Sequence, residues 1–270
     1  MEISNINKKK IRESLKEDKR LDGRKPEDFR KIEIETGISK NAEGSARVKI
    51  GDTEVIAGIK VDVSEPYPDH EDEGTMITTL ELLPLSSSRF EYGPPRIEAI
   101  EIARIIDRVI RESGFIDFKK LCIKKGEKVY TVLIDLYTLN DDGNLIDAGC
   151  IAAVEALKSA KMPKYDEKTE KIKFGEFSSK SLPLNERVPV TITSYKIGDK
   201  IVVDTTREEE DSSTSRISFG LTDSKKGDDI IISSLQKGGE GTFTQEEISK
   251  IIDLTVRKFK DIQKETEGVE

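Results

Sequence analysis

The feature that most constrains the fold is a run of alternating apolar and polar residues over positions 32–63. Residues 51–52, Gly-Asp, interrupt this run with the composition of a hairpin turn. A period of two places successive side chains on opposite faces of a strand. A further strand is predicted over about 75–83, ending at Pro84. The first part of the chain is therefore predicted to form a sheet that begins with a hairpin.

Two helices and two more strands are predicted to follow. Residues 96–112 begin after Pro94-Pro95, and their apolar side chains recur on one helical face. Strands are predicted near 120–124 and 128–139, and a helix rich in small residues over 145–160. The strand at 128–139 is apolar on both faces, so we expect it to be central and covered on both sides.

The composition changes at 161–187, which is rich in Lys and poor in aliphatic residues, so we place a subdomain boundary there. Beyond it, four short strands are predicted to precede a helix over 245–264, with Thr244 and Glu247 as a capping box. Strands and helices in both halves predict an α+β fold with a loose internal duplication. The predicted divisions are an N-terminal arm or helix over 1–20, a first half over 21–163, a connecting segment over 164–187, a second half over 188–264 and a tail over 265–270.

The composition excludes several classes of protein. No apolar run approaches the roughly 18 residues that a membrane-spanning helix needs, so no membrane contact is expected. Cys122 and Cys150 are too few for a disulfide framework, which favours a reduced, cytoplasmic setting. His70 is the one histidine, which excludes sites with several histidine ligands, and we interpret it as a solvated loop residue.

A row of arginines lies on the helix predicted over 96–112. Arg104, Arg108 and Arg111 are spaced four and three apart, so they share one helical face. Guanidinium groups suit phosphate oxygens because each planar fork donates two hydrogen bonds to one anion. Glu101 and Asp107 flank the same face, however, and Asp107 and Arg111 have the spacing of an ordinary ion pair. The face is therefore either a phosphate-binding surface or a solvated surface that pairs with itself.

An acidic run at 207–211 follows the strand that ends at Asp204. Clustered carboxylates at a strand end can hold Mg²⁺, but most such runs are solvated loops. Glycine-bearing turns at 141–144 and 237–241 lack the patterns of nucleotide-binding loops, and we interpret the first as a turn that leads into a helix N-cap.

Several segments together resemble the RNase PH family. They are LDGRKPEDFR at 21–30, the hairpin at 44–61, LELLPL at 80–85, FEYGPP at 90–95, AIEIARIIDR at 99–108 and DDGNLIDA at 141–148. The resemblance extends over nearly the whole chain. FEYGPP followed by AIEIAR is similar to the non-catalytic RNase PH-like subunits of the archaeal exosome.

The resemblance implies an RNase PH fold of two similar β-α-β halves (ribosomal protein S5 domain 2-like), with mixed sheets and packed helices. It also implies a ring of three heterodimers with a catalytic RNase PH-like paralogue, and RNA-binding cap proteins as further partners. Such a ring degrades RNA from the 3′ end with inorganic phosphate and releases nucleoside diphosphates. No cofactor is implied.

Two marks of catalytic family members are altered in this sequence. A Gly-Ser/Thr-Arg step that binds phosphate is replaced by Gly-Asn-Leu at 143–145. Two aspartates expected six and twelve positions beyond Asp204 are replaced by Glu210 and Arg216. The second replacement turns attraction of a divalent cation into repulsion. We therefore expect neither a catalytic residue nor a metal site in this chain, and no nuclease activity from the chain alone.

The resemblance also assigns a role to the arginine helix. It implies RNA-phosphate contacts for Arg104 and Arg108, with Arg96 before the helix as a further candidate. Two other hypotheses stay open. The chain is a divergent phosphate-dependent exoribonuclease in its own right, with metal held by residues 208–211, or it is a spacer whose arginines pair with neighbouring acids.

Overall fold

The computed structural model describes residues 4–224 and 229–266. The first three residues of the predicted arm and positions 267–270 of the predicted tail lie outside the described residues. None of the described helices is long and apolar enough to cross a bilayer.

The first sheet is mixed and contains six strands. Its order is β1-β2-β3-β6-β4, with β5 paired to β6. The predicted hairpin turn is confirmed, because Ile50 and Thr53 pair on either side of residues 51–52. Only β4 runs parallel to its neighbour β6. The strands are β1 (Ile32–Thr36), β2 (Gly44–Ile50), β3 (Thr53–Ser64), β4 (Thr75–Glu81), β5 (Cys122–Lys124) and β6 (Lys128–Asn140).

Strand β6 is central, as predicted, but the expectation that both of its faces are covered is wrong. Its residues alternate between buried and partly exposed, and Tyr137 on the outer face is 37% exposed. One aromatic residue of this outer face contacts a second ring. The rings of Tyr130 and Tyr165 lie edge to face, with their centroids 6.2 Å apart.

Helices α2 (Ile97–Ser113) and α3 (Leu145–Ser159) pack on the inner face of the first sheet. The apolar stripe predicted for α2 is buried. Helix α3 is buried on every side from Leu145 to Leu157, which explains its small residues. Gly149 lets the two helices approach, because a Cβ there would lie 2.8 Å from Cδ1 of Ile106.

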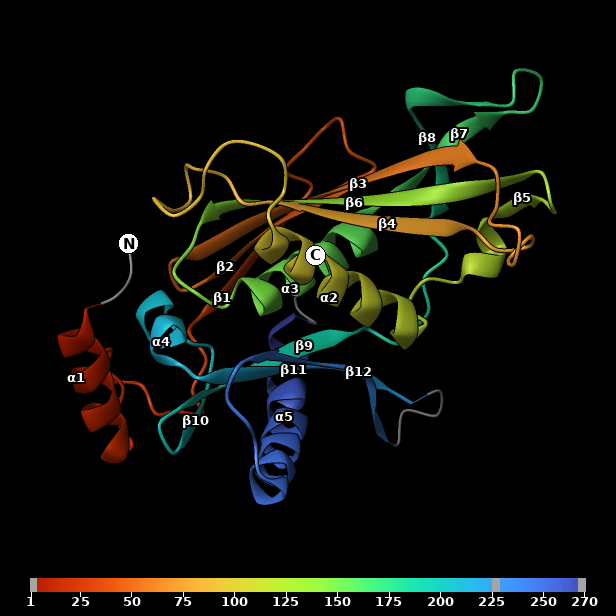
Figure 1. The fold of residues 1–270 in the computed structure, drawn as a ribbon. Helices are drawn as coiled ribbons and strands as arrows, with labels where there is room; N and C mark the ends of the chain where they lie inside the picture. Colours follow the sequence, from red (N-terminus) through yellow and green to blue (C-terminus); the bar gives the residue numbers. More distant parts are fainter. Residues whose placement is uncertain (1–3, 225–228, 267–270) are drawn as a thin grey trace.

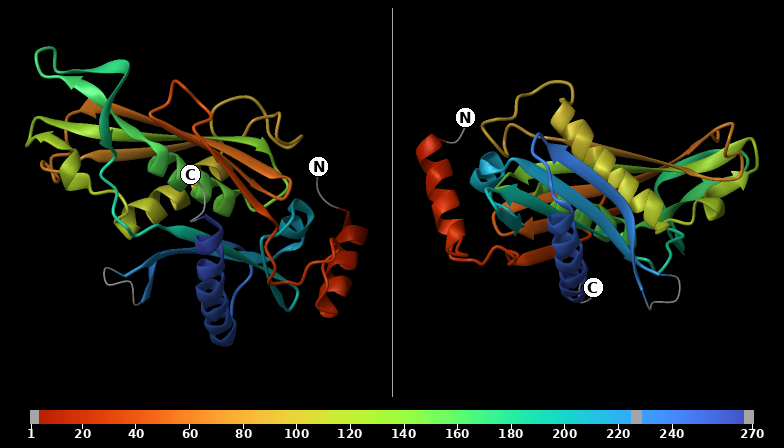
Figure 2. Two further views of the ribbon diagram at one scale, coloured as in Figure 1. Left: turned by 180° about the vertical axis from the view of Figure 1, so that it is seen from behind. Right: turned by 60° about the horizontal axis from the view of Figure 1, so that its bottom comes forward.

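The second sheet is antiparallel throughout and has the order β10-β9-β11-β12. Its strands are β9 (Val190–Ile197), β10 (Lys200–Val203), β11 (Ser215–Asp223) and β12 (Ile230–Gly239). Helix α5 (Gln245–Thr266) packs on its far face, so that sheet, helices, sheet and helix succeed one another as layers (Figures 1 and 2). The predicted capping box of α5 is confirmed by reciprocal hydrogen bonds between Thr244 and Glu247, 2.8 and 3.2 Å long.

The remaining elements lie toward the ends of the molecule (Figure 1). Helix α1 (Asn5–Lys16) buries Ile11 and Leu15 against the second sheet. A hairpin of β7 (Lys161–Asp166) and β8 (Lys171–Ser181) begins just before the predicted connecting segment 164–187 and lies mostly within it. The 3-10 helix η1 (Phe118–Leu121) lies between α2 and β5 along the chain. The acidic run forms a short helix, α4 (Arg207–Ser212), rather than a loop, because Thr206 and Glu209 cap its first turn.

Candidate nucleic-acid interface

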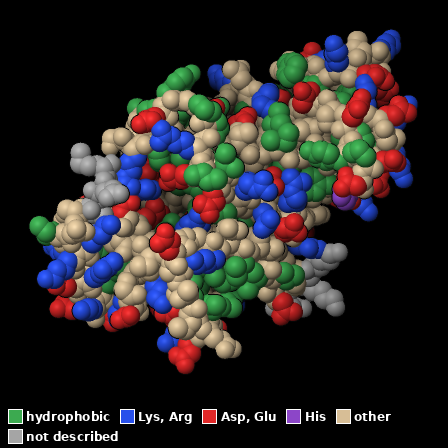
Figure 3. All heavy atoms as spheres, in the orientation of Figure 1, with side chains coloured by type: hydrophobic (Ala, Val, Ile, Leu, Met, Phe, Trp, Pro, Cys, Tyr) green, Lys and Arg blue, Asp and Glu red, His purple; other side chains and the backbone are tan. Residues whose placement is uncertain are grey.

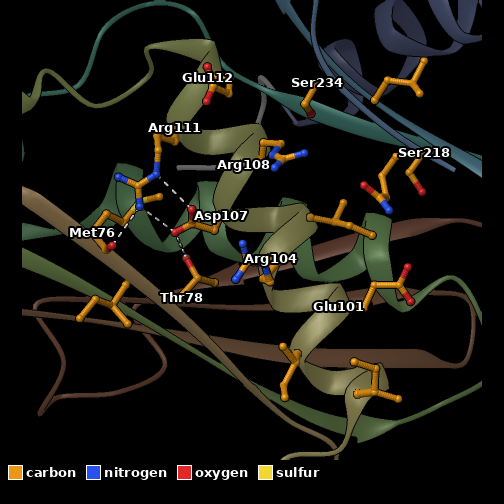
Figure 4. A pocket seen from close by; sticks show the side chains of 16 residues that line it. Met76, Thr78, Glu101, Arg104, Asp107, Arg108, Arg111, Glu112, Ser218 and Ser234 are labelled. Carbon is orange, nitrogen blue, oxygen red and sulfur yellow. Dashed lines mark hydrogen bonds and ion pairs between the residues drawn. The ribbon is translucent and has the colours of Figure 1, made fainter. Parts of the chain in front are cut away.

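The exposed face of α2 forms one wall of a groove of about 630 Å³. Strand β4 and strand β12 supply the other walls, and the right-hand view of Figure 2 shows α2 beside β12. Figure 3 shows Lys and Arg side chains gathered at the centre of this face. Arg104, Arg108 and Arg111 line the groove from successive turns of α2 (Figure 4). The predicted shared face of the three arginines is therefore confirmed.

The three arginines differ in their partners. Arg111 donates to both carboxylate oxygens of Asp107, at 3.1 and 3.0 Å, and to the carbonyl of Met76 at 3.0 Å. Arg104 and Arg108 are exposed and form no ion pair with any residue in the described part of the chain. Self-pairing thus accounts for Arg111 but leaves two guanidinium groups of the groove available to a ligand.

Arg96 does not belong to this groove. It is the exposed N-cap residue of α2, and its guanidinium pairs with Glu91 in the preceding loop. It lines a separate hollow beneath residues 82–95 instead. Its contact with RNA stays a prediction.

A second pocket, of about 260 Å³, lies on the other side of Glu101, between α2, α4 and β11. Of the acidic candidates for a metal site at 208–211, it contains Glu210 and Asp211, and arginines of the same chain pair with both. Arg207 lies 3.1 Å from Glu210 and 3.7 Å from Asp211. It also lies 3.8 Å from Glu98 and 3.6 Å from Asp141.

Arg216 enters the same pocket from β11. Its Nη2 atom lies 2.7 Å from Oε1 of Glu101, which comes from α2. Asp211 forms a second ion pair, with Arg89. These long-range pairs were missed by sequence reasoning, because partners such as Arg216 and Glu101 lie more than a hundred positions apart.

Glu210 lines this pocket, but both of its carboxylate oxygens are bonded within the chain. Its Oε1 accepts the backbone N–H of Asn144 at 2.7 Å and the hydroxyl of Tyr195 at 2.8 Å. Burial raises the pKa of Glu210, against the opposing effect of Arg207. Burial and the Glu210 charge together raise the pKa of Tyr195 well above its ordinary value, so the phenol stays a donor to the carboxylate.

The same contact fills the position expected to bind phosphate in catalytic relatives. Asn144 is the N-cap of α3, which confirms the interpretation of the 141–144 turn, but its side chain does not cap the helix. Instead its N–H is satisfied by Glu210. The turn is pressed so closely against the start of α4 that a Cβ at Gly143 would lie 2.5 Å from the Thr205 carbonyl oxygen. This end of α3 therefore faces a carboxylate of its own chain.

The DGR segment has a structural role that the sequence pattern did not reveal. Arg24 and Arg30 both bind the buried carboxylate of Asp204, at 2.8 and 2.7 Å, and the side chain of Asn144 donates to it at 2.9 Å. Burial acts to raise the pKa of Asp204, but Arg30 and Arg24 outweigh it and hold that pKa below its usual value. Asp204 also has a positive φ of 45° at the end of β10. The contacts of Asp204 with Arg24, Arg30 and Asn144 hold the chain just before the start of α4, beside the second pocket.

His70 is exposed in its loop, as interpreted, and contacts Asp69 and Glu73. Among the described residues, no set of three or more His, Cys, Asp or Glu side chains is arranged to hold a metal ion.

Comparison with known proteins identifies the class to which this fold and these pockets belong. The model of the 3′ exoribonuclease family, domain 1, matches residues 28–163, and that of domain 2 matches residues 187–258. The chain belongs to the 3′ exoribonuclease (RNase PH) family, and the predicted family and fold are confirmed.

Within this family, the chain is similar to proteins named as exosome components. The chain is 45% identical to the exosome complex component Rrp42 of Methanocella arvoryzae, over 93% of this chain and 92% of that one. It is 46% identical to the protein of the same name from Thermococcus gammatolerans, over 97% and 94% of the two chains. Among solved structures, it matches a chain of the Archaeoglobus fulgidus exosome with RNA bound to the active site, with a TM-score of 0.83, 38% identity and coverage of 95% and 97%.

Proposed function

We propose that this chain is the non-catalytic ring subunit of an archaeal exosome. It pairs with a catalytic RNase PH-like paralogue in a ring of three heterodimers, receives RNA-binding cap proteins, and helps to bind RNA during 3′-to-5′ phosphorolysis in the cytoplasm. Relatives named as exosome components, at over 40% identity along nearly the whole chain, support its place in such a complex.

One observation carries the non-catalytic assignment: arginines of the chain itself are paired with the carboxylates of the acidic pocket. Arg207 lies within 4 Å of Glu210 and Asp211, and Arg216 is paired with Glu101. Two unit charges about 4 Å apart interact by roughly 4 kcal/mol at an effective dielectric of about 20. A divalent cation placed here would be repelled by two guanidinium groups and would compete with them for every carboxylate. The residues present therefore do not fit a catalytic Mg²⁺.

The position expected to bind the phosphate co-substrate is also altered in this chain. The residues at 143–145 carry neither the hydroxyl nor the guanidinium expected in catalytic relatives. The N–H that opens α3 is already bonded to Glu210, whose negative charge would repel an anion.

The groove of α2 supports a role in RNA binding. Arg104 and Arg108 are exposed, unpaired among the described residues, and on one face of a rigid helix. Guanidinium contacts to backbone phosphates position a nucleic acid without reading its sequence. The formal net charge of −8 does not oppose this role, because the local basic surface acts on the RNA. It does imply weak RNA binding by the isolated subunit.

The alternative, a divergent exoribonuclease, would need residues 208–211 to bind a metal. Each of these carboxylates has another partner. Glu208 accepts from Asn7 at 3.4 Å, and Glu209 is buried against Arg20. Glu210 and Asp211 pair with Arg207. No observation favours the alternative.

The two accounts differ in what happens when the acidic residues lose their charge. We expect rings that contain the E210Q variant, and separately the D211N variant, to degrade poly(A) at the wild-type rate. Gln at 210 keeps the oxygen that accepts from Asn144 and Tyr195, so the fold is preserved. The assay is nucleoside diphosphate release in phosphate buffer, with ring mass checked by light scattering. A fall of about a hundredfold or more in either ring of normal mass would mean that this pocket is catalytic.

A further inference from the structure

The unpaired state of Arg104 is unexpected from the sequence of its own helix. Glu101 precedes Arg104 by three positions and Asp107 follows it by three. Side chains three or four residues apart on a helix are neighbours, and opposite charges at that spacing attract each other. An isolated helix of this sequence would therefore place two carboxylates next to Arg104. The folded protein holds both of them elsewhere.

Glu101 pairs with Arg216 of the second sheet rather than with Arg104. Its Oε1 lies 2.7 Å from Nη2 of Arg216, whose side chain is only 15% exposed. Asp107 is bound by residues other than Arg104. Arg111 donates two hydrogen bonds to it, and Thr78 donates to it at 3.4 Å. Figure 4 shows Asp107 linked to Arg111 and Thr78 rather than to Arg104. Glu112 lies four positions beyond Arg108 and lines the groove. Among the described residues, Glu112 and Arg108 form no ion pair with each other.

The absence of a side chain at Gly238 of β12 leaves room for the side chain of Arg216. Arg216 pairs across the sheet with Gly238, and its side chain lies directly over that residue. A Cβ at position 238 would come within 2.9 Å of Nε and Cζ of Arg216. The φ of Gly238 is not positive, so the backbone itself does not require glycine there. The absence of a side chain leaves the space through which the guanidinium reaches α2.

We infer that Arg216 is a positioning residue for RNA binding: it holds the Glu101 carboxylate and thereby keeps the guanidinium of Arg104 free for a phosphate. This inference rests on the proposed function of the α2 groove. It gives the arginine that replaces an acid of catalytic relatives a role of its own. Arg111 acts in the same way on Asp107 from the other side.

A double-mutant cycle tests the inference in the assembled ring. Binding of a fluorescent single-stranded RNA is measured at several salt concentrations without inorganic phosphate, so that the RNA is not consumed. R216A frees Glu101 to pair with Arg104, and we expect affinity to fall about two- to fivefold. The slope of log affinity against log salt should fall by less than about 0.7, the value for complete loss of one phosphate contact, because Glu101 only competes with the RNA for Arg104.

The rescue separates this mechanism from a general effect of charge. E101Q alone should change affinity and slope little, because Arg216 already neutralises Glu101. In the R216A background, E101Q should restore both values to those of the wild type. Equal effects of E101Q in the two backgrounds would mean that Arg216 acts only as a distant positive charge, and would overturn the inference.

A second variant leaves the formal charge unchanged. G238A should displace the Arg216 guanidinium and reproduce the R216A result, again with rescue by E101Q. R257A, which removes a guanidinium paired with Glu27 at the remote helix α5, is the matched control and should have no effect. R104A separates the two proposals. If R104A leaves affinity unchanged, RNA binding by the groove is refuted, whereas weaker binding by R104A with an additive cycle refutes the inference alone.

Discussion

Reversing the charge of Arg104 and Arg108 together should weaken RNA binding by the assembled ring about a hundredfold. Both side chains are exposed in the α2 groove and have no ion-pair partner among the described residues. A hydrogen bond to a charged group contributes about 1.5–3 kcal/mol, so each lost contact costs about tenfold or more. The two glutamates of R104E/R108E would in addition repel the RNA backbone. Titration of the ring with labelled single-stranded RNA in phosphate-free buffer measures the effect.

The control for this variant is R257E, which makes the same kind of charge reversal on α5. It should leave RNA affinity within about twofold of the wild type, because it lies outside the groove and surface charges are screened by salt. Wild-type affinity in R104E/R108E rings of normal mass would contradict the proposed interface. It would favour the hypothesis that the chain is only a spacer.

The largest expected effect on stability comes from Arg20. Its side chain is fully buried and pairs with Glu209, which is 5% exposed. Its guanidinium also donates to the carbonyl oxygens of Val203 and Asp204, at 3.0 and 2.7 Å. Removing one member of a buried ion pair costs about 3–5 kcal/mol, because the other charge is left without compensation. We therefore expect R20A to lower the free energy of unfolding by about that amount, as measured by denaturant titration.

Two comparisons identify the cause of that loss. R257A breaks an exposed pair and should lower the free energy of unfolding by less than about 1 kcal/mol. R20M/E209Q removes both buried charges but keeps a side-chain oxygen that can accept from the Thr206 N–H, so it should be more stable than R20A, because no buried charge is left unpaired. If R20A is as stable as R257A, the contacts of Arg20 with Glu209, Val203 and Asp204 do not hold α4 in place.

Sequence reasoning located the elements whose signals are local. The hairpin at 51–52, the buried stripe of α2 and the capping box at Thr244 each depend on residues within a few positions of one another. Helix α4 was not predicted, because its six residues depend on a cap rather than on an apolar stripe. The hairpin of β7 and β8 escaped detection because its exposed lysines conceal any alternation.

For the candidate site, the sequence predicted which arginines share a face but not which of them are free. Their state depends on residues brought from other elements. Arg216 comes from the second sheet to meet Glu101, and the Met76 carbonyl comes from β4 to meet Arg111. The roles of Arg24 and Arg30 likewise needed Asp204, which is more than 170 positions away. Contacts over such distances in the chain leave no periodic signal.

The most direct test of the central claim compares the purified chain alone with the chain mixed with a catalytic RNase PH-like paralogue. Both samples receive poly(A), inorganic phosphate and Mg²⁺, and nucleoside diphosphates are quantified alongside molecular mass. The account predicts no diphosphate from the chain alone, and a hexameric ring with phosphate-dependent release from the mixture. Phosphate-dependent diphosphate release by the chain alone would contradict it.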